Sequence, residues 1–149
     1  MTENLADSTT LHKTVFLAAS REVVWAYLTD KDRLGEWFHP GVDSLEAGKP
    51  YQLYKSDDRT SIMLRGDILV ADRPSFLSYT GTVKPIGDLL TRLSWTLDEV
   101  PGGTRLSLLQ EGVGEAAGDA ALAALIKLDN GWDKHFSDLR RITETGVSS

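Results

Sequence analysis

Cysteine is absent from this chain of 149 residues, which excludes disulfide bonds, thiol catalysis and cysteine-ligated zinc together. Histidine is scarce, and His12, His39 and His135 fall on different predicted elements, so we expect no metal site and no cofactor. Long apolar runs are also missing, and no stretch would cross a bilayer as a helix. Residues 1–10 are polar and acidic, unlike a secretory signal, and we expect a disordered lead on a cytoplasmic protein.

Catalytic signatures are lacking as well. The sequence contains no Gly-x-Ser-x-Gly motif, no phosphate-binding glycine loop and no dinucleotide fingerprint. Glu36 and Glu111 are candidates for general acid or base, but neither has a partner visible in the sequence. The sequence therefore predicts no catalytic residues and a protein that is not an enzyme. The net charge of −6 disfavours binding to nucleic acid or to an anionic membrane.

What the sequence does contain is one long amphipathic segment, Asp119–Glu144, which we predict to be a helix. Gly131 lies at the edge of its apolar stripe, where glycine costs about 1 kcal/mol relative to alanine. Tight helix–sheet packing is the favoured explanation, and close approach of a ligand is the alternative. Leu122 and Ile126 point away from the stripe and are expected to meet a loop or a second subunit, as in a homodimer. The stripe consists of Ala121, Leu125, Leu128, Trp132, Phe136 and Leu139, with Ile142 at its edge.

The segments before this helix predict an α+β fold. A strand at His12–Ala18 is followed by two short helices, Ser20–Thr29 and Lys31–Phe38, with Ser20 and Asp30 as their N-caps. Because a sheet with one apolar face and a helix with one apolar stripe satisfy each other by packing, we expect a curved antiparallel sheet wrapped on the long helix. The remaining predicted strands are Tyr51–Lys55, Ser61–Ala71, Phe76–Val83, Leu89–Leu97 and Thr104–Val113, the last two joined by a hairpin at Pro101-Gly102-Gly103.

Short motifs occur in a distinctive order between His12 and Glu144. They are Ala19-Ser20-Arg21-Glu22-Val23-Val24-Trp25, Leu28-Thr29-Asp30, Leu34-Gly35-Glu36-Trp37-Phe38, Gly66 before Asp72-Arg73-Pro74, Leu93-Ser94-Trp95, Gly103-Thr104-Arg105-Leu106, Gln110-Glu111-Gly112 and Gly131-Trp132. In this order and at these spacings the chain resembles the START-like, Bet v 1-like helix-grip superfamily. Within it, the chain is similar to the C-terminal domain of the activator of the Hsp90 ATPase.

The resemblance implies a single domain over residues 11–145, followed by a tail at 146–149. Its fold is a curved sheet that grips a long C-terminal helix, with two short helices closing one end over a cavity. Many relatives carry a histidine where this chain has Gln110, so acid–base chemistry at that position is in doubt. A glutamine there still donates and accepts hydrogen bonds.

We expect the function to be noncatalytic binding of a small, mostly hydrophobic molecule between the sheet and the long helix, with Gln110 or His135 supplying a polar contact. A dry core made of the same aromatic residues is an equal alternative. Two further alternatives are a protein-binding module for an Hsp90-type chaperone and a polyketide-cyclase-like or hydrolase-like enzyme. Trp37 and Trp95 are expected at the cavity wall and Trp132 at the centre of the helix–sheet contact. The residues expected to line the cavity are Trp37, Phe38, Tyr79, Leu93, Trp95, Leu108, Gln110, Leu128, Trp132, His135 and Phe136.

Overall fold

The computed structural model describes residues 10–55, 60–83, 90–112 and 121–147. In chain order, these form β1 (Leu11–Leu17), α2 (Arg21–Thr29), α3 (Lys31–Trp37), β2 (Pro50–Tyr54), β3 (Ile62–Asp72), β4 (Phe76–Val83), β5 (Leu90–Val100), β6 (Gly103–Glu111) and α5 (Ala121–Val147). The strands make one antiparallel sheet of six, in the order β1-β6-β5-β4-β3-β2. The predicted α+β class and helix-grip architecture are confirmed.

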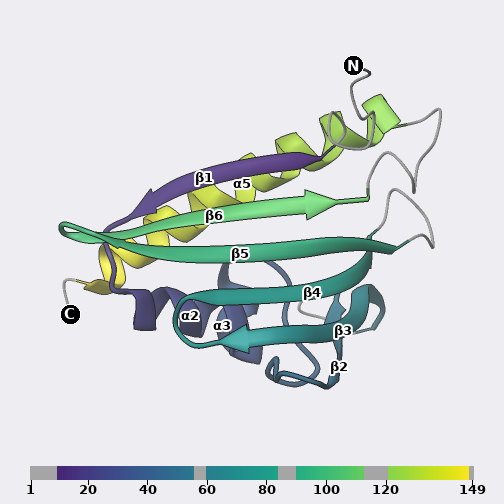
Figure 1. The fold of residues 1–149 in the computed structure, drawn as a ribbon, viewed down its shortest axis with the longest axis horizontal. Helices are drawn as coiled ribbons and strands as arrows, with labels where there is room; N and C mark the ends of the chain where they lie inside the picture. Colours follow the sequence, from purple (N-terminus) through teal and green to yellow (C-terminus); the bar gives the residue numbers. More distant parts are fainter. Residues whose placement is uncertain (1–9, 56–59, 84–89, 113–120, 148–149) are drawn as a thin grey trace, which may run out of the picture.

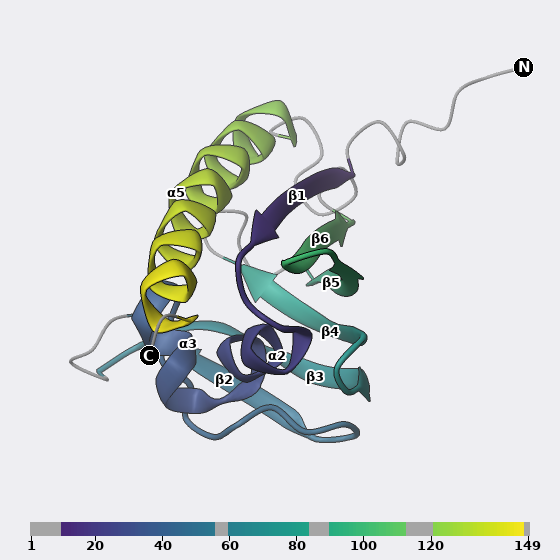
Figure 2. The same ribbon diagram turned by 90° about the vertical axis from the view of Figure 1, so that its left-hand side faces the viewer.

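The helices α2, α3 and α5 lie against the same side of the sheet (Figure 1). The long helix α5 runs behind β1 and β6, while α2 and α3 lie behind the β3 and β4 half of the sheet. Turned by 90°, the view shows the sheet curving around this layer, with α2 and α3 at one end of α5 (Figure 2). The two short helices therefore complete the helical layer at that end of α5.

Local chemistry explains where the short elements begin. The Ser20 hydroxyl accepts a hydrogen bond from the Val23 amide at 3.3 Å, and the Asp30 carboxylate accepts from the amides of Asp32 and Arg33 at 2.9 and 3.2 Å. Both N-caps are as predicted. The β5–β6 hairpin is also confirmed, and its tight turn requires Gly102, whose φ of 86° is in the left-handed region.

The sheet bends where its strand pairing is irregular. The register shifts between Leu53 and Tyr54 on β2 and again between Ile68 and Val70 opposite β4. Gly66 lies between these two points, and a Cβ there would overlap the Thr80 carbonyl group of the neighbouring strand. Glycine is required for this close approach of two backbones, which lets the sheet curve towards α5.

Buried and exposed residues alternate along the central strands. On β6, the side chains of Thr104, Leu106, Leu108 and Gln110 are all buried on the inner face. Arg65 and Arg92, which alternate out of phase with the apolar residues, are exposed. The inner face, the α5 stripe and one side of α2 and α3 form a single core.

Several predicted boundaries need correction. Helix α5 continues to Val147, so residues 146 and 147 are helical and do not belong to a tail. Helix α3 ends at Trp37, and Phe38 is its C-cap. The predicted strand start at Leu89 and the predicted helix start at Asp119 lie outside the described residues. Residues 1–9 of the predicted disordered lead also lie outside them. None of the helices in the described ranges is long and apolar enough to span a membrane.

Candidate functional site

A small, mostly apolar pocket opens between α5, the end of α3 and the sheet. Its volume is about 130 Å³. The hydrophobic wall comes from Phe38 beside α3, Leu93 on β5, and Leu128 and Trp132 on α5. The described residues that line it are Phe38, His39, Met63, Leu64, Leu93, Lys127, Leu128, Gly131, Trp132 and His135.

Gly131 borders this pocket from the middle of α5. Apart from its two chain neighbours and the nearby backbone of α5 itself, a Cβ added at Gly131 would meet no atom of the described residues within 4 Å, so the position faces open space. The interpretation that Gly131 permits tight helix–sheet packing is therefore wrong. The alternative, that the missing side chain leaves room beside Trp132, agrees with the geometry.

Two histidines also line the pocket, His39 just after α3 and His135 on α5. Their ring centroids are 5.6 Å apart, and both rings contact Phe38, at centroid distances of 4.7 and 4.9 Å. The Nδ1 atom of His135 lies 2.9 Å from the carbonyl oxygen of Trp37, and that of His39 lies 3.1 Å from the carbonyl oxygen of Lys55. A carbonyl oxygen only accepts hydrogen bonds, so Nδ1 carries the proton in each ring and Nε2 is the nitrogen with the lone pair.

Both imidazoles are neutral near pH 7. Burial lowers the pKa of His39 below its ordinary value of 6.5, against smaller opposing effects of the backbone hydrogen bonds. Burial is also the main cause that lowers the pKa of His135, with further lowering by His39 when that ring is protonated and by the charge of Lys134. The hydrogen bond to Trp37 and the charge of Asp138 act in the opposite direction on His135 but are outweighed.

The residues expected to line a cavity divide into two groups. Phe38, Leu93, Leu128, Trp132 and His135 line the pocket. The others are buried in the core around it and are not among the lining residues: Trp37, Tyr79, Trp95, Leu108, Gln110 and Phe136. The space between sheet and helix is thus mostly filled by side chains, and the pocket occupies only part of the expected cavity.

Gln110 is fully buried and connects α5 to the sheet. Its Oε1 accepts a hydrogen bond from Trp132 Nε1 at 3.1 Å, and its Nε2 donates to the Thr91 hydroxyl at 3.1 Å. The Thr91 hydroxyl in turn donates to the carbonyl oxygen of Gly81 at 3.1 Å. The amide expected to contact a ligand therefore uses both of its polar atoms in this chain of hydrogen bonds within the core.

Trp37 and Trp95 were expected at the cavity wall, but neither lines the pocket. Trp132 is part of the helix–sheet contact, as expected, and it also lines the pocket. The Trp95 indole donates to the Tyr79 hydroxyl at 3.0 Å, and the Trp37 indole donates to the carbonyl oxygen of Tyr27 at 2.8 Å. Burial raises the pKa of Tyr79, which keeps the phenol protonated in this apolar cluster.

Four residues line the pocket that were not expected to do so from the sequence, namely His39, Met63, Leu64 and Lys127. The mid-helix glycine was a usable signal, because residues on the same face of a helix follow it and precede it by three or four positions. Lys127 is four residues before Gly131, and His135 is four residues after it. No comparable signal marks Met63 and Leu64, which reach the pocket through the curvature of β3.

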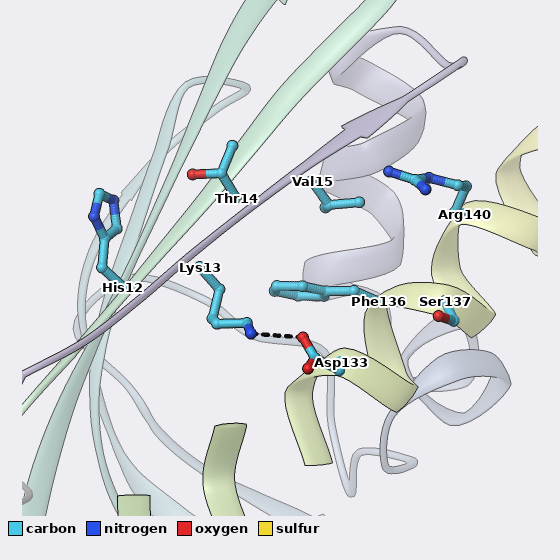
Figure 3. Close-up of a pocket in the computed structure, with 8 residues that line it drawn as sticks. All are labelled: His12, Lys13, Thr14, Val15, Asp133, Phe136, Ser137 and Arg140. Atoms are coloured by element: carbon cyan, nitrogen blue, oxygen red, sulfur yellow. Dashed lines mark ion pairs between the residues drawn. The ribbon is translucent and has the colours of Figure 1, made fainter. Parts of the chain in front are cut away.

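A second hollow lies between β1 and α5 (Figure 3). It has a volume of about 390 Å³, and Lys13 and Asp133, which form an ion pair, are among its lining residues. The Lys13 ammonium lies 2.5 Å from Asp133 and 2.8 Å from Asp129, both on α5. Burial alone would lower the pKa of Lys13, but the hydrogen bonds and charges of the two carboxylates outweigh burial and raise it. These charges satisfy one another and hold α5 against the edge strand.

The arrangement in the described part of the chain offers hydrogen bonding and apolar contact. No group of three or more histidine or acidic side chains that could hold a metal ion occurs in the described ranges. His39 and His135 are held by backbone carbonyl groups, a partner that orients an imidazole without making it a stronger base as a carboxylate would.

The profile of the family described as Activator of Hsp90 ATPase homolog 1-like protein matches residues 18–144. Among curated proteins, no match to the sequence was found.

Solved structures provide further likenesses. Protein MLL2253 from Mesorhizobium loti superposes with a TM-score of 0.70 at 23% identity, over 89% of this chain and 97% of the other. DynU16, from the dynemicin biosynthetic locus, superposes with a TM-score of 0.77 at 20% identity. The match covers 93% of this chain but only 48% of DynU16, so this chain spans about half of DynU16. The Aha1 dimer from Colwellia psychrerythraea superposes with a TM-score of 0.72 at 15% identity, over 92% of this chain and 97% of the other. At identities this low, the likeness shows the shared fold alone.

Proposed function

We propose that this chain, which belongs to the family of Activator of Hsp90 ATPase homolog 1-like proteins, binds a small, mostly hydrophobic molecule without converting it chemically. The binding site is the pocket beside Gly131, and the observation that carries the proposal is that α5 leaves this space open in mid-helix. A glycine in a helix interior costs stability, so an empty space at that glycine is better explained by a ligand than by packing.

The size of the pocket limits the ligand. A volume of about 130 Å³ is close to that of apolar protein cavities that take up a single benzene ring, roughly 150 Å³. The walls supply Phe38 and Trp132 rings, whose centroids are 5.0 Å apart, and the side chains of Leu93 and Leu128. A single ring or a short branched chain fits this space, while a large polycyclic molecule would leave most of its surface outside.

The noncatalytic part of the proposal is supported by the partners of the two histidines. A catalytic imidazole usually has a carboxylate or a nucleophile as its hydrogen-bond partner. Here, each Nδ1 instead donates to a backbone carbonyl oxygen. Incubation with aryl esters, followed by product analysis, tests this part, and turnover that disappears in His135→Gln would refute it.

The binding proposal is tested by filling the pocket. Toluene should bind the wild-type protein and change the tryptophan emission, because Trp132 lines the pocket. In Gly131→Leu, the new side chain should occupy the space and abolish the response. Asn130→Leu, at the exposed neighbouring position on α5, is the matched control and should respond like the wild type. No binding of toluene to the wild-type protein, or equal binding to Gly131→Leu, would refute the proposal.

A second candidate function comes from the family description, which names an activator of the Hsp90 ATPase. A co-chaperone of this type would raise the ATP turnover of a cognate Hsp90 and bind it saturably. We expect neither effect from this chain, since we assign its function to the binding of a small molecule in the pocket beside Gly131. Clear stimulation of turnover at micromolar protein would make the partner-binding function the leading one.

A further inference from the structure

We propose that the mouth of the pocket is a carboxylate site, in which His39, His135 and Lys127 hold the acid group of a small ring-bearing carboxylic acid. This inference rests on the proposed function, because the ring of the acid would occupy the same apolar pocket. It adds the chemical class of the ligand.

Two separate parts of the chain bring the histidines together. His39 follows α3 and His135 lies on α5, yet their ring centroids are only 5.6 Å apart. Both rings also contact the Phe38 ring. Both line the pocket, which Phe38 also lines. A ligand whose ring packs on Phe38 would therefore have two imidazoles within reach of a polar group at its end.

The hydrogen bonds of these histidines decide which ring atom meets the ligand. Because each Nδ1 donates to a backbone carbonyl oxygen, Nε2 is the atom left to interact with a ligand. A neutral Nε2 accepts a hydrogen bond, and after taking up a proton it becomes a charged donor. A carboxylate is the group that gains most from this change, since it accepts charge-assisted hydrogen bonds.

The charges around the mouth favour an acid over an amine. The protein carries a net charge of −6, but none of the described residues that line the pocket is acidic. Lys127 is an exposed cation at the rim, one turn of α5 before Gly131. The other charged groups that act on His135 are Lys134 and Asp138, on its own helix, and His39 faces it from the end of α3. An ammonium ligand would find no described carboxylate in the lining, whereas a carboxylate would find Lys127 and two imidazoles.

Binding of such an acid should take up a proton. Burial keeps both imidazoles neutral in the empty pocket, and a carboxylate beside them favours the charged form. The acid should therefore bind more tightly as the pH falls towards 6, while a neutral molecule of the same shape should show no such dependence.

Benzoate and benzamide make the comparison, because they share one ring and differ in the charge of the headgroup. By isothermal titration at about pH 6, benzoate should bind about tenfold more tightly than benzamide. A tenfold difference is the effect expected if bound benzoate raises the pKa of an imidazole by about one unit. At about pH 8 the difference should shrink to the contribution of Lys127, roughly twofold to threefold. Titrations in buffers of different ionisation enthalpy should show proton uptake with benzoate only.

Variants identify the groups responsible. Lys127→Gln should weaken the binding of benzoate and leave the affinity for benzamide unchanged. Arg105→Gln, which removes a cation from the outer face of the sheet, should change neither affinity. His39→Phe should remove most of the benzoate preference while toluene still binds. Equal binding of benzoate and benzamide at both pH values, with toluene bound, would overturn the carboxylate site and leave the proposed function intact. If toluene, benzamide and benzoate all fail to bind, both the carboxylate site and the proposed function are overturned.

Discussion

Among single residues, Gln110 shows how a polar side chain can be part of the core. It lies on the inner face of β6, where its amide joins the Trp132 indole on α5 to the Thr91 hydroxyl on β5. All three groups are buried, so each hydrogen bond replaces one that water would have made in the unfolded chain. The net contribution of such bonds is modest, but leaving one partner unsatisfied is costly.

We therefore expect Gln110→Leu to destabilise the protein although leucine is more hydrophobic. The buried Trp132 N–H would lose its acceptor, at a cost of about 1–3 kcal/mol. Urea unfolding followed by circular dichroism measures the difference. Gln52→Leu, on an exposed position of β2, is the control and should change stability by less than about 0.5 kcal/mol. Equal effects of the two substitutions would contradict the role given to Gln110.

The two pocket histidines predict how stability depends on pH. Their folded-state pKa values lie below the ordinary value of 6.5, so the unfolded chain binds more protons in the window between the folded-state pKa and 6.5. Their contribution to stability is present above that window and is lost as the pH falls through it. The unfolding free energy of the wild type should thus fall more between about pH 7 and 5 than that of the double variant His39→Gln/His135→Gln.

The matched control for this pH effect is Asn130→Gln, which keeps every histidine and lies at an exposed position on α5. It should retain the pH dependence of the wild type. The account of the histidines is wrong if the double variant shows the same slope as the wild type.

At the residue scale, the sequence predicted which side chains point inward but not what they do there. The inward face of Gln110 follows from strand alternation, a local property. Its partners are on β5 and α5, and no pattern in the sequence reveals that Trp132 and Thr91 meet it. His39 shows the same limit, because the partner of its Nδ1 atom is a backbone carbonyl beyond β2.

At the scale of elements, α5 is held by different chemistry along its length. Lys13 on the edge strand β1 pairs with Asp129 and Asp133. The Trp132 indole bonds to β6, and His135 bonds to the end of α3. The helix is thus fixed on three sides around Gly131, which explains how an open space persists beside it.

Two glycines on different elements should respond in opposite ways to alanine. Gly131→Ala adds a methyl group in open space and removes the entropy cost of a helical glycine, so it should stabilise the protein by about 0.5–1 kcal/mol. Gly66→Ala would place its Cβ onto the Thr80 backbone and should destabilise the protein strongly. Thermal unfolding of both variants measures this, and destabilisation by Gly131→Ala would show that the space is not open in solution.

The elements themselves were predictable because their signals are local. Ser20 and Asp30 cap helices by bonding to amides two or three residues away, and Gly102 sets the hairpin turn. The interpretation of Gly131 failed because a tight backbone contact and room for a ligand are both reasons for a glycine in the middle of a helix. Only the position of the sheet relative to α5 distinguishes them.

At the scale of the whole molecule, the described interior is a packed aromatic core, and the pocket beside Gly131 lies at its side. Trp95 contacts Trp37, Trp132 and Phe136 at centroid distances of 6.1, 5.4 and 6.0 Å. It is almost fully buried, at 1% exposure. The sequence predicted a cavity or a dry core as equal alternatives, and the structure contains a part of each. Which aromatic residues belong to which part depends on the curvature of β3, which the sequence alone does not determine.

This division predicts the cost of removing each tryptophan. Trp95→Ala should cost about 3–5 kcal/mol, because its side chain has packed neighbours on all sides. Trp132→Ala should cost less, since one side of the indole already faces the pocket. Denaturant unfolding of the two variants gives the comparison. A larger loss for Trp132→Ala would indicate that the pocket wall is as tightly packed as the core.

The central claim is that a single ring binds between Phe38, Leu93 and Trp132. The most direct test is X-ray diffraction from crystals soaked with bromobenzene, with data collected at the bromine absorption edge. The account predicts an anomalous peak inside the pocket of the wild-type protein and none there in Gly131→Leu. A wild-type crystal without bromine in the pocket, or one with bromine only elsewhere, would contradict it.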